Sequence, residues 1–283
     1  MRRWLLTGGG GMVATDLRLA LEVRREYAVV KSRADLDVTN ARLVQQAMDD
    51  VRPDVIVNCA AWTNVDDAES QESAAAAVNG GAVELLAQSA NTIGARLVQL
   101  STDFVFDGSK REPYEPGDQT HPLSAYGRTK LLGETAATHA TRHLILRTSW
   151  LFGVHGPNFV EAMKRQIAKG VDPLKVVDDQ RGRPTFTPHL ADAIIRLVDA
   201  EAQGIVHYAD AGDVSWFAFA CAIVAAVGSL VHVQPVSSEE FQRPAPRPAY
   251  SVLSTSRYTE LTGAEPESWR EGLMDYLAAR RAT

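Results

Sequence analysis

The chain has 283 residues, of which 45% are hydrophobic, and a formal net charge of −6 at neutral pH. This length allows a large domain plus a smaller one, and a negative net charge without a basic run argues against nucleic acid or an anionic membrane as the main partner. No apolar run approaches the roughly 18 residues of a membrane span, and residues 1–6 meet Gly8 before a signal peptide's apolar region could form. We therefore expect a cytoplasmic protein.

The first predicted strand, residues 4–7, runs into a glycine-rich turn and then into the amphipathic segment Asp16–Arg25. The turn has the spacing Gly8-x-x-Gly11-x-x-Ala14, which lets the backbone approach a pyrophosphate and leaves a small residue for packing of the helix on the strand. Free N–H groups at the start of the helix would favour the phosphates. The pattern predicts a dinucleotide site, and a merely flexible glycine turn is the alternative.

The second predicted strand is Tyr27–Lys31, and the residues at its end decide which cofactor fits. A carboxylate there suits the ribose hydroxyl of NAD, whereas cationic and hydroxyl groups accommodate the 2′-phosphate of NADP. Because Ser32 and Arg33 follow the strand directly, we expect NADPH. NADH remains possible because Asp35 and Asp37 lie close behind.

The next segments predict the middle of a parallel sheet. A helix opens near Thr39, its expected N-cap, and runs to about Asp50. The apolar strand 54–58 ends in small residues, including Ala60, that let a flat ligand approach the backbone. A helix over residues 73–91, interrupted by Gly80 and Gly81, precedes the strand 96–100, which leads into Ser101 and Thr102.

Tyr126 and Lys130 are four residues apart on a predicted helix, so they share one face. An ammonium beside a phenol favours the phenolate and lowers the phenol's pKa, which suits proton exchange with a carbonyl or alcohol oxygen. Thr102, at the end of the preceding strand, can point its hydroxyl at the same oxygen. A solvated surface pair is the alternative interpretation of Tyr126 and Lys130.

The strand 143–147 completes five β-then-α units, which predict an α/β fold with a Rossmann-type, doubly wound parallel sheet. We expect residues 1–149 to form the NAD(P)-binding domain, with residues 186–202 returning to it. Residues 150–283 are expected to form a smaller α/β domain that binds the substrate. In that part we predict helices over residues 159–169, 190–200, 215–227 and 268–281 and a strand over residues 174–177.

The sequence also allows predictions about phosphate recognition, the two cysteines and metal binding. Arg243 and Arg247 lie in a proline-rich loop, and arginines suit phosphate recognition through their planar fork. Cys59 and Cys221 are far apart in sequence and have no metal-ligand cluster around them, so we expect two small core residues rather than a disulfide. We predict no metal site.

At this point the chain resembles the dTDP-4-dehydrorhamnose reductase family of the extended short-chain dehydrogenase/reductases. Any one of its motifs is widespread, but the set, in this order and spacing over nearly the whole chain, is specific. The segments that carry the resemblance are the glycine turn, residues 58–69, 101–108, Tyr126-x-x-x-Lys130, 147–150, 178–185 and 243–253.

The resemblance implies a reaction in which NADPH delivers a hydride to C4 of a nucleotide-activated 4-keto-6-deoxy sugar. Thr102, Tyr126 and Lys130 match the catalytic trio, in which the tyrosine gives the proton and the lysine lowers its pKa and binds the nicotinamide ribose. The predicted cofactor contacts are Gly8, Gly11, Met12, Val13, Ser32, Arg33, Asp37, Val38, Ala60, Ala61, Thr63, Leu100, Tyr126 and Lys130. The predicted substrate contacts are Thr102, Asp103, Trp150, Arg243 and Arg247.

The chain also departs from the family pattern. Met12 stands where the family usually has Gln, and Phe104 stands where it usually has Tyr. These changes leave the sugar open, so reduction of a related 4-keto or branched sugar, as in dihydrostreptose formation, is an alternative. A cofactor-binding regulatory subunit without catalysis is an alternative of another class. We expect a monomer or a homodimer.

Overall fold

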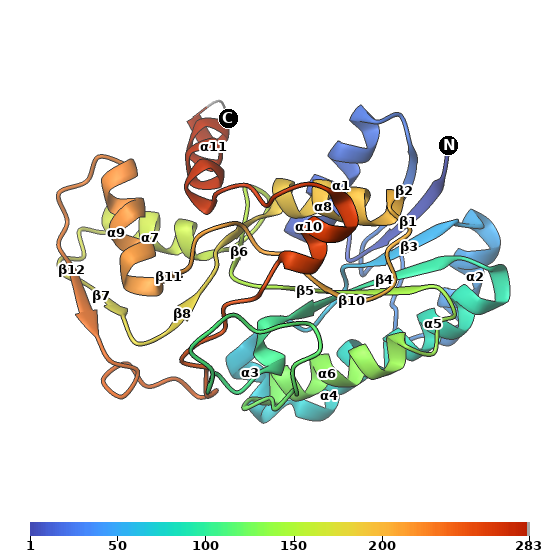
Figure 1. Ribbon diagram of the computed structural model, residues 1–283, viewed down its shortest axis with the longest axis horizontal. Coiled ribbons are helices and arrows are strands. Elements are labelled where there is room, and N and C mark those ends of the chain that lie inside the picture. Colours follow the sequence, from blue (N-terminus) through green and yellow to red (C-terminus); the bar gives the residue numbers. More distant parts are fainter. Residues whose placement is uncertain (282–283) are drawn as a thin grey trace.

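The computed structural model describes residues 1–281, and its centre is a six-stranded parallel sheet (Figure 1). The strands lie in the order β10-β5-β4-β3-β1-β2, so the direction of winding reverses between β1 and β3. The predicted doubly wound α/β fold is thus confirmed. The strands span Arg3–Thr7 (β1), Tyr27–Lys31 (β2), Val55–Asn58 (β3), Arg96–Thr102 (β4), His143–Thr148 (β5) and Gly204–His207 (β10).

Helices cover both faces of this sheet, because its strands are apolar on both sides. On β1, Trp4 and Leu6 pack in the core of one face and Leu5 packs in the core of the other. Such double burial is the rule for parallel sheets. The first face is covered by α1 (Met12–Val23), α8 (Thr187–Asp199) and α10 (Ser256–Thr262), and the second by α2 (Ala41–Val51), α5 (Ala82–Ile93) and α6 (Ala125–Ala137) (Figure 1).

Three local details differ from the expectations. Asn40, not Thr39, caps α2, because its side chain accepts hydrogen bonds from two backbone N–H groups of the first turn. The Thr39 hydroxyl instead donates to Asp37. Gly80 and Gly81 do not break the helical segment: α4 (Glu72–Ala76) continues through the π-helix η1 (Ala77–Gly81) into α5. The strand β10 was not predicted at all.

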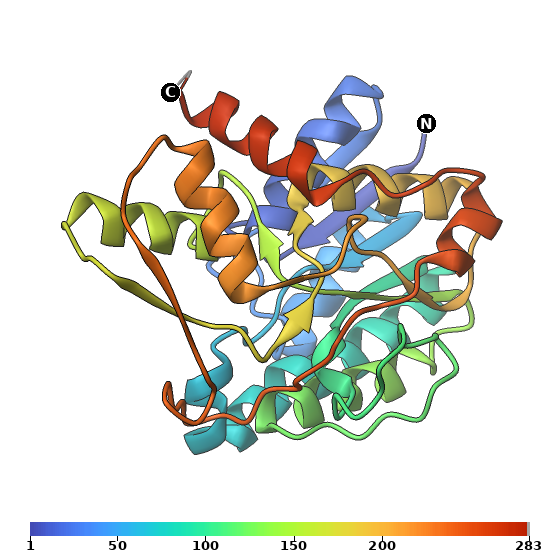
Figure 2. The same ribbon diagram turned by 60° about the vertical axis from the view of Figure 1, so that its left-hand side comes forward.

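The second half of the chain builds a smaller group of helices and two-stranded ladders beside the sheet, seen in yellow-green, orange and red in Figure 2. Aromatic side chains, including Phe152, Phe219 and Tyr276, fill its core. Its helices are α7 (Phe159–Ala168), α9 (Trp216–Ala226) and α11 (Trp269–Arg281). Its ladders pair β6 (Leu151–Phe152) with β9 (Thr185–Phe186), β7 (Leu174–Val177) with β12 (Val233–Val236), and β8 (Arg181–Gly182) with β11 (Val214–Ser215).

Two further observations concern the whole described chain. Cys59 and Cys221 are both free thiols, and each is half-buried. Within residues 1–281, no helix has the length and apolar character to cross a bilayer.

A buried ion pair joins α6 to the sheet. Arg147 on β5 donates two hydrogen bonds to the Glu134 carboxylate, at 2.8 and 2.7 Å, and both side chains are at most 4% exposed. Ser101 on β4 donates a third hydrogen bond to Glu134 at 2.5 Å. This bidentate geometry satisfies both charges, whereas removing either partner would leave the other charge buried alone.

We expect Glu134→Gln to lower the free energy of unfolding by about 3–5 kcal/mol, because it leaves the Arg147 guanidinium buried without a carboxylate. Urea denaturation measures this change. Asp192→Asn is the matched control, since it breaks the exposed pair with Arg196 on α8 and should cost less than about 1 kcal/mol. Equal losses in the two variants would contradict the importance of the buried pair.

Candidate active site

The glycine turn lies at the carboxyl ends of β1 and β3. Gly8 has a φ of 67°, and a Cβ there would come within 2.7 Å of the Ala60 nitrogen, so only glycine fits. The turn closes through a hydrogen bond from the Gly11 N–H to the Gly8 carbonyl oxygen at 2.9 Å. No side chain among the described residues caps α1. The first N–H groups of a twelve-residue helix are therefore open to an anion.

The end of β2 lies beside this turn, because the Gly9 N–H donates to the Lys31 carbonyl oxygen. The two nearby carboxylates accept hydrogen bonds within their own local turns. Asp35 accepts hydrogen bonds from the N–H and hydroxyl of Ser32, and Asp37 accepts two from Thr39. These bonds lower the pKa of both carboxyls. Arg33 is exposed beside them.

A ladder of buried side-chain hydrogen bonds crosses the carboxyl ends of the three central strands. Thr7 on β1 donates to Asn58 on β3 at 2.6 Å, and Asn58 donates to Gln99 on β4 at 2.8 Å. Gln99 donates to the Leu100 carbonyl oxygen at 2.7 Å. The same oxygen accepts a hydrogen bond from the Lys130 ammonium at 2.7 Å. The ladder thus links all three strand ends to α6.

The start of α6 is held tightly against the end of β4. Ser124 caps the helix by accepting a hydrogen bond from the Gly127 N–H at 3.1 Å. A Cβ at Gly127 would lie 2.2 Å from the Phe104 carbonyl oxygen, so the missing side chain permits this close approach. The helix therefore brings Tyr126 next to Thr102, the last residue of β4.

Burial decides the protonation state of the half-buried Tyr126. Burial raises the pKa of the phenol to about 12. The nearby Asp103 charge also raises this pKa, whereas the hydrogen bond with the Thr102 hydroxyl lowers it. This corrects the expectation that Lys130 lowers the pKa of Tyr126: the ammonium of Lys130 lies against the Leu100 carbonyl oxygen instead. At neutral pH the Tyr126 phenol is therefore protonated.

Lys130 is buried, at 4% exposure. Burial lowers its pKa to about 8, and the Glu134 carboxylate one helical turn further along α6 opposes this shift. The ammonium is therefore fixed by its hydrogen bond to the Leu100 carbonyl oxygen and is attracted by the Glu134 carboxylate. That arrangement fixes the position of the cation on the tyrosine's side of the helix.

Asp103, in the short 3-10 helix η2 (Asp103–Val105), lies beneath Thr102 and is 1% exposed. It accepts hydrogen bonds from the Thr102 hydroxyl at 3.0 Å and from the Ser251 hydroxyl at 2.5 Å. Burial raises its pKa to about 6 despite these bonds. Both carboxylate oxygens are therefore engaged within the protein. Ser251 could not be assigned to the site from the sequence, because its partner Asp103 is distant in the chain.

Asn79 is a second residue that the sequence analysis missed. It lies in the π-helix η1, is 1% exposed, and connects the residues after β3 to α6. Its side chain accepts from the Trp62 N–H at 2.8 Å and donates to the Thr129 hydroxyl at 3.0 Å. π-Helical turns are frequent at functional sites, and the Gly80-Gly81 pair was the only signal for this one in the sequence.

Arg243 and Arg247 converge on one carboxylate, that of Asp66 in α3 (Val65–Ser70). Their guanidinium nitrogens lie 3.1 and 3.0 Å from its oxygens. Both arginines line a cavity of about 270 Å³ whose other walls are mainly apolar and aromatic. The cavity is also lined by Phe159, Ala162, Met163, Lys175, Val176, Val177, Gln180, Trp216 and Phe241.

Trp150 supports this cavity from behind. Its indole stacks on that of Trp216 with ring centroids 3.6 Å apart. A Cβ at Gly182 would lie 2.5 Å from the Trp150 ring, so the glycine makes room for it. Trp150 has a φ of 48°, a left-handed conformation that a bulky residue rarely adopts.

The remaining predicted cofactor residues lie around the glycine turn and the strand ends. Met12 and Ala61 are half-buried and Thr63 is exposed, whereas Val38 packs in the core below the sheet. Among residues 1–281, no three His, Cys, Asp or Glu side chains are arranged to hold a metal ion.

The chain is similar to known proteins over its whole length. The family model described as the RmlD substrate binding domain matches residues 1–282. The dTDP-4-dehydrorhamnose reductase of Streptomyces griseus is 42% identical over 98% of this chain and 93% of its own. A protein of Streptomyces antibioticus described as a probable dTDP-4,6-dihydroxy-2-methyloxan-3-one 4-ketoreductase is also 42% identical, over 98% of this chain and 96% of its own.

A solved structure has the same fold. The crystal structure of dTDP-4-dehydrorhamnose reductase from Bacillus anthracis in complex with NADP superposes with a TM-score of 0.94 at 35% identity. The superposition covers 98% of this chain and 99% of that one.

We expect Gly127→Ala to lower the free energy of unfolding by about 1–3 kcal/mol, because the new methyl group collides with the Phe104 carbonyl and pushes α6 away from β4. Chemical denaturation measures the loss. Gly117→Ala serves as the control, since a Cβ there meets nothing within 4 Å. If the two variants are equally stable, the close contact at Gly127 does not constrain α6.

The raised pKa of Asp103 predicts a pH dependence of stability. Between its ordinary value of 3.8 and about 6, the unfolded chain releases this proton while the folded protein keeps it. The folded state therefore loses stability as the pH rises through this window. Asp103→Asn cannot ionise; its amide oxygen can accept from one of the two hydroxyls and its amide nitrogen can donate to the other, so at pH 7 it should raise the free energy of unfolding by on the order of 2 kcal/mol.

Denaturation of this variant and of wild type from pH 3 to pH 8 tests the expectation. The increase in the free energy of unfolding of Asp103→Asn over wild type should fall toward zero below pH 3.8. Asp50→Asn, at an exposed position on α2, is the control and should show no such gain. A gain independent of pH would refute the assignment of the effect to ionisation.

Proposed function

Since the chain belongs to the RmlD family, we propose that it reduces the C4 keto group of dTDP-4-dehydro-L-rhamnose to give dTDP-L-rhamnose, with NADPH as reductant. The family membership that the motifs implied is confirmed. The observation that carries the proposal is the meeting of Thr102, Tyr126 and Lys130 at the carboxyl edge of a doubly wound sheet. A dinucleotide phosphate turn lies at the same edge.

The glycine turn supports a dinucleotide cofactor. Its backbone can approach a pyrophosphate closely, and the uncapped start of α1 supplies N–H donors for it. When bound, the nicotinamide supplies the hydride that reduces the carbonyl carbon. The residues proposed to hold the cofactor are Gly8, Gly11, Met12, Val13, Ser32, Arg33, Asp37, Val38, Ala60, Ala61, Thr63, Leu100, Tyr126 and Lys130.

The end of β2 favours the phosphorylated cofactor. Asp35 and Asp37 are tied to Ser32 and Thr39 within their own turns. Arg33 is exposed next to them and has no carboxylate within ion-pair distance in residues 1–281. An exposed guanidinium suits the 2′-phosphate.

Tyr126 is the proposed proton donor. Its raised pKa keeps the phenol protonated at neutral pH, which is the state needed to protonate an alkoxide that develops at C4. The Thr102 hydroxyl lies between Tyr126 and Asp103, and it would turn its proton from the Asp103 carboxylate toward the same oxygen when the sugar is bound. The Asp103 carboxylate orients that hydroxyl, and Ser251 fixes the carboxylate in turn. Lys130 holds a positive charge next to the reacting groups.

The cavity beside α7 and α9 is the proposed site for the nucleotide part of the substrate. Phe159 and Trp216 offer aromatic faces for a base, and their ring centroids are 4.6 Å apart. Arg243 and Arg247 offer guanidinium forks for the diphosphate, held in place by Asp66. Trp150 backs this wall.

These assignments suggest a division of labour along the chain. Residues 1–149 would hold the cofactor, together with residues 186–202, since α8 packs on the same face of the sheet as α1. Residues 150–283 would hold the substrate, and the reaction would occur between them. The proposed assembly is a monomer or a homodimer in the cytoplasm.

A sister activity is the second candidate. The similarity to a probable 4-ketoreductase of another dTDP-sugar, together with Met12 and Phe104, favours reduction of a related keto sugar as the alternative. A regulatory subunit without catalysis has no chemical need for Thr102, Tyr126 and Lys130 together.

The test is NADPH oxidation with dTDP-4-dehydro-L-rhamnose generated in situ. Wild type should consume NADPH and form dTDP-L-rhamnose. Tyr126→Phe keeps the ring and loses the proton donor, so turnover should fall by about 10²-fold to 10⁴-fold while NADPH binding persists. Tyr27→Phe is the control, because this tyrosine is 54% exposed on β2, and it should behave like wild type.

The outcomes separate the alternatives. NADPH binding without turnover of this sugar would refute the rhamnose assignment, and a panel of other keto sugars would then distinguish a sister reductase from a regulatory subunit. Full activity in Tyr126→Phe would refute the role of Tyr126 as proton donor.

A further inference from the structure

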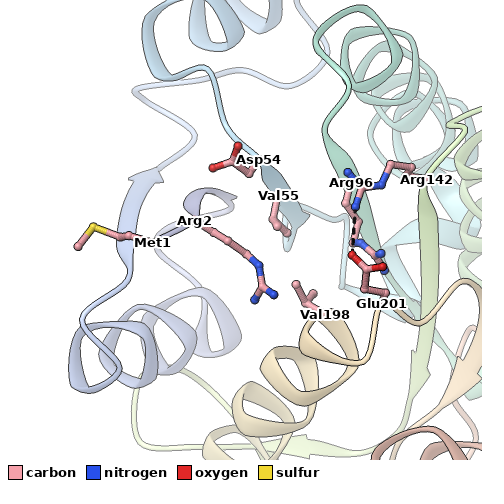
Figure 3. A pocket seen from close by; sticks show the side chains of 8 residues that line it. All are labelled: Met1, Arg2, Asp54, Val55, Arg96, Arg142, Val198 and Glu201. Carbon is pink, nitrogen blue, oxygen red and sulfur yellow. Dashed lines mark ion pairs between the residues drawn. The ribbon is translucent and has the colours of Figure 1, made fainter.

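A second pocket lies at the opposite edge of the sheet from the catalytic trio. Asp54 and Arg142 directly precede β3 and β5, and Arg96 begins β4, so the pocket collects residues at the amino ends of the strands. Its volume is about 290 Å³. It is lined by Met1, Arg2, Asp54, Val55, Arg96, Arg142, Val198 and Glu201 (Figure 3).

Arg96 is the central observation, because it is only 2% exposed. A buried guanidinium normally has a carboxylate partner, yet none lies within 4 Å of Arg96 in the described part of the chain. Within residues 1–281, its one side-chain hydrogen bond goes from Nη1 to the Ala202 carbonyl oxygen at 2.5 Å. A guanidinium has five N–H donors, so Arg96 retains donor capacity at the wall of the pocket.

The nearby carboxylates leave the pocket with an excess of positive charge. Glu201 is 75% exposed, forms an ion pair with Arg142 at 3.7 Å and also favours the charged form of Arg96, so the lining holds two carboxylates, Asp54 and Glu201, against three guanidinium groups. The Asp54 carboxylate accepts a hydrogen bond from the Arg3 N–H and points away from Arg96 in Figure 3. Arg2, whose side chain extends into the middle of the pocket, has one ion pair, with Asp199 outside the lining.

Like charges that converge in this way repel one another. Burial is the main cause that lowers the pKa of Arg96; the charges of Arg142 and Arg2 lower it further, and the Glu201 carboxylate opposes this shift. A polyvalent anion between the three guanidinium groups would remove this repulsion and use their free N–H donors. Guanidinium groups bind phosphate oxygens in pairs of parallel hydrogen bonds, and a tetrahedral, multiply charged oxyanion can accept from several directions at once.

We propose that this pocket, built by Arg2, Arg96 and Arg142 at the amino edge of the sheet, binds an oxyanion of the phosphate class. The inference does not depend on the proposed function. The site lies at the amino ends of strands whose carboxyl ends carry the glycine turn and Thr102, so it is separate from the cofactor and from the cavity at Arg243.

Isothermal titration of wild-type protein saturated with NADPH, using inorganic pyrophosphate as the probe, tests the proposal. We expect saturable binding, and we expect Arg96→Gln and Arg142→Gln each to weaken it by about 10-fold or more, the loss of one charge-assisted contact. If Arg96→Gln does not fold, Arg142→Gln still tests the proposal, because Arg142 is 46% exposed and its substitution should leave the fold intact.

Two control variants locate the bound probe. Arg42→Gln, on the exposed surface of α2, should leave the affinity unchanged. Arg243→Gln should weaken only binding of the probe at the other cavity, where the substrate diphosphate is proposed to lie, and should leave the affinity of the site that Arg142→Gln weakens unchanged. Absence of saturable binding in wild type would overturn the proposal. So would binding that is lost in Arg243→Gln but kept in Arg142→Gln.

Discussion

The site depends on one chain of buried hydrogen bonds, from Thr7 through Asn58 and Gln99 to the Leu100 carbonyl and Lys130. Each of these polar groups is removed from water, and a buried donor or acceptor without a partner costs about 1–3 kcal/mol. The ladder therefore sets the relative position of the three strand ends. The glycine turn, the residues after β3 and the end of β4 all begin at this ladder, so the proposed cofactor contacts and Thr102 have fixed positions relative to one another.

Helix α6 is the second element on which the site depends. Its first turn positions Tyr126, and its later turns carry Lys130 and the buried Glu134. Gly127 lets the first turn of α6 pack closely against Phe104, and Ser124 caps this turn. Tyr126 therefore lies next to Thr102. One turn beyond Lys130, Glu134 is locked to Arg147 in the interior. The burial that makes this packing possible also raises the pKa of Tyr126 and lowers that of Lys130. A protonated phenol beside a fixed cation suits a reductase, which must give a proton to an alkoxide.

Segments from the end of the chain return to complete the site. Ser251 donates a hydrogen bond to Asp103, the residue after Thr102, and Arg247 donates one to Asp66 at the start of α3. The two contacts join residues 148 and 181 positions apart in the sequence. They connect the proposed substrate cavity to the loops that follow β3 and β4. Binding of the nucleotide and positioning of the reacting oxygen would thus be physically linked.

The sequence alone determined the features that local pattern controls: the glycine turn between strand and helix, the apolar strands of a parallel sheet, and the shared face of Tyr126 and Lys130. Tertiary structure alone decided the rest. Ser251, Asp66 and Asn79 acquire their partners through contacts across the fold, which no spacing reveals. The short strand β10 forms because β5 offers it a free edge. The direction of the pKa shift of Tyr126 follows from burial, and burial is a property of the folded chain rather than of a motif.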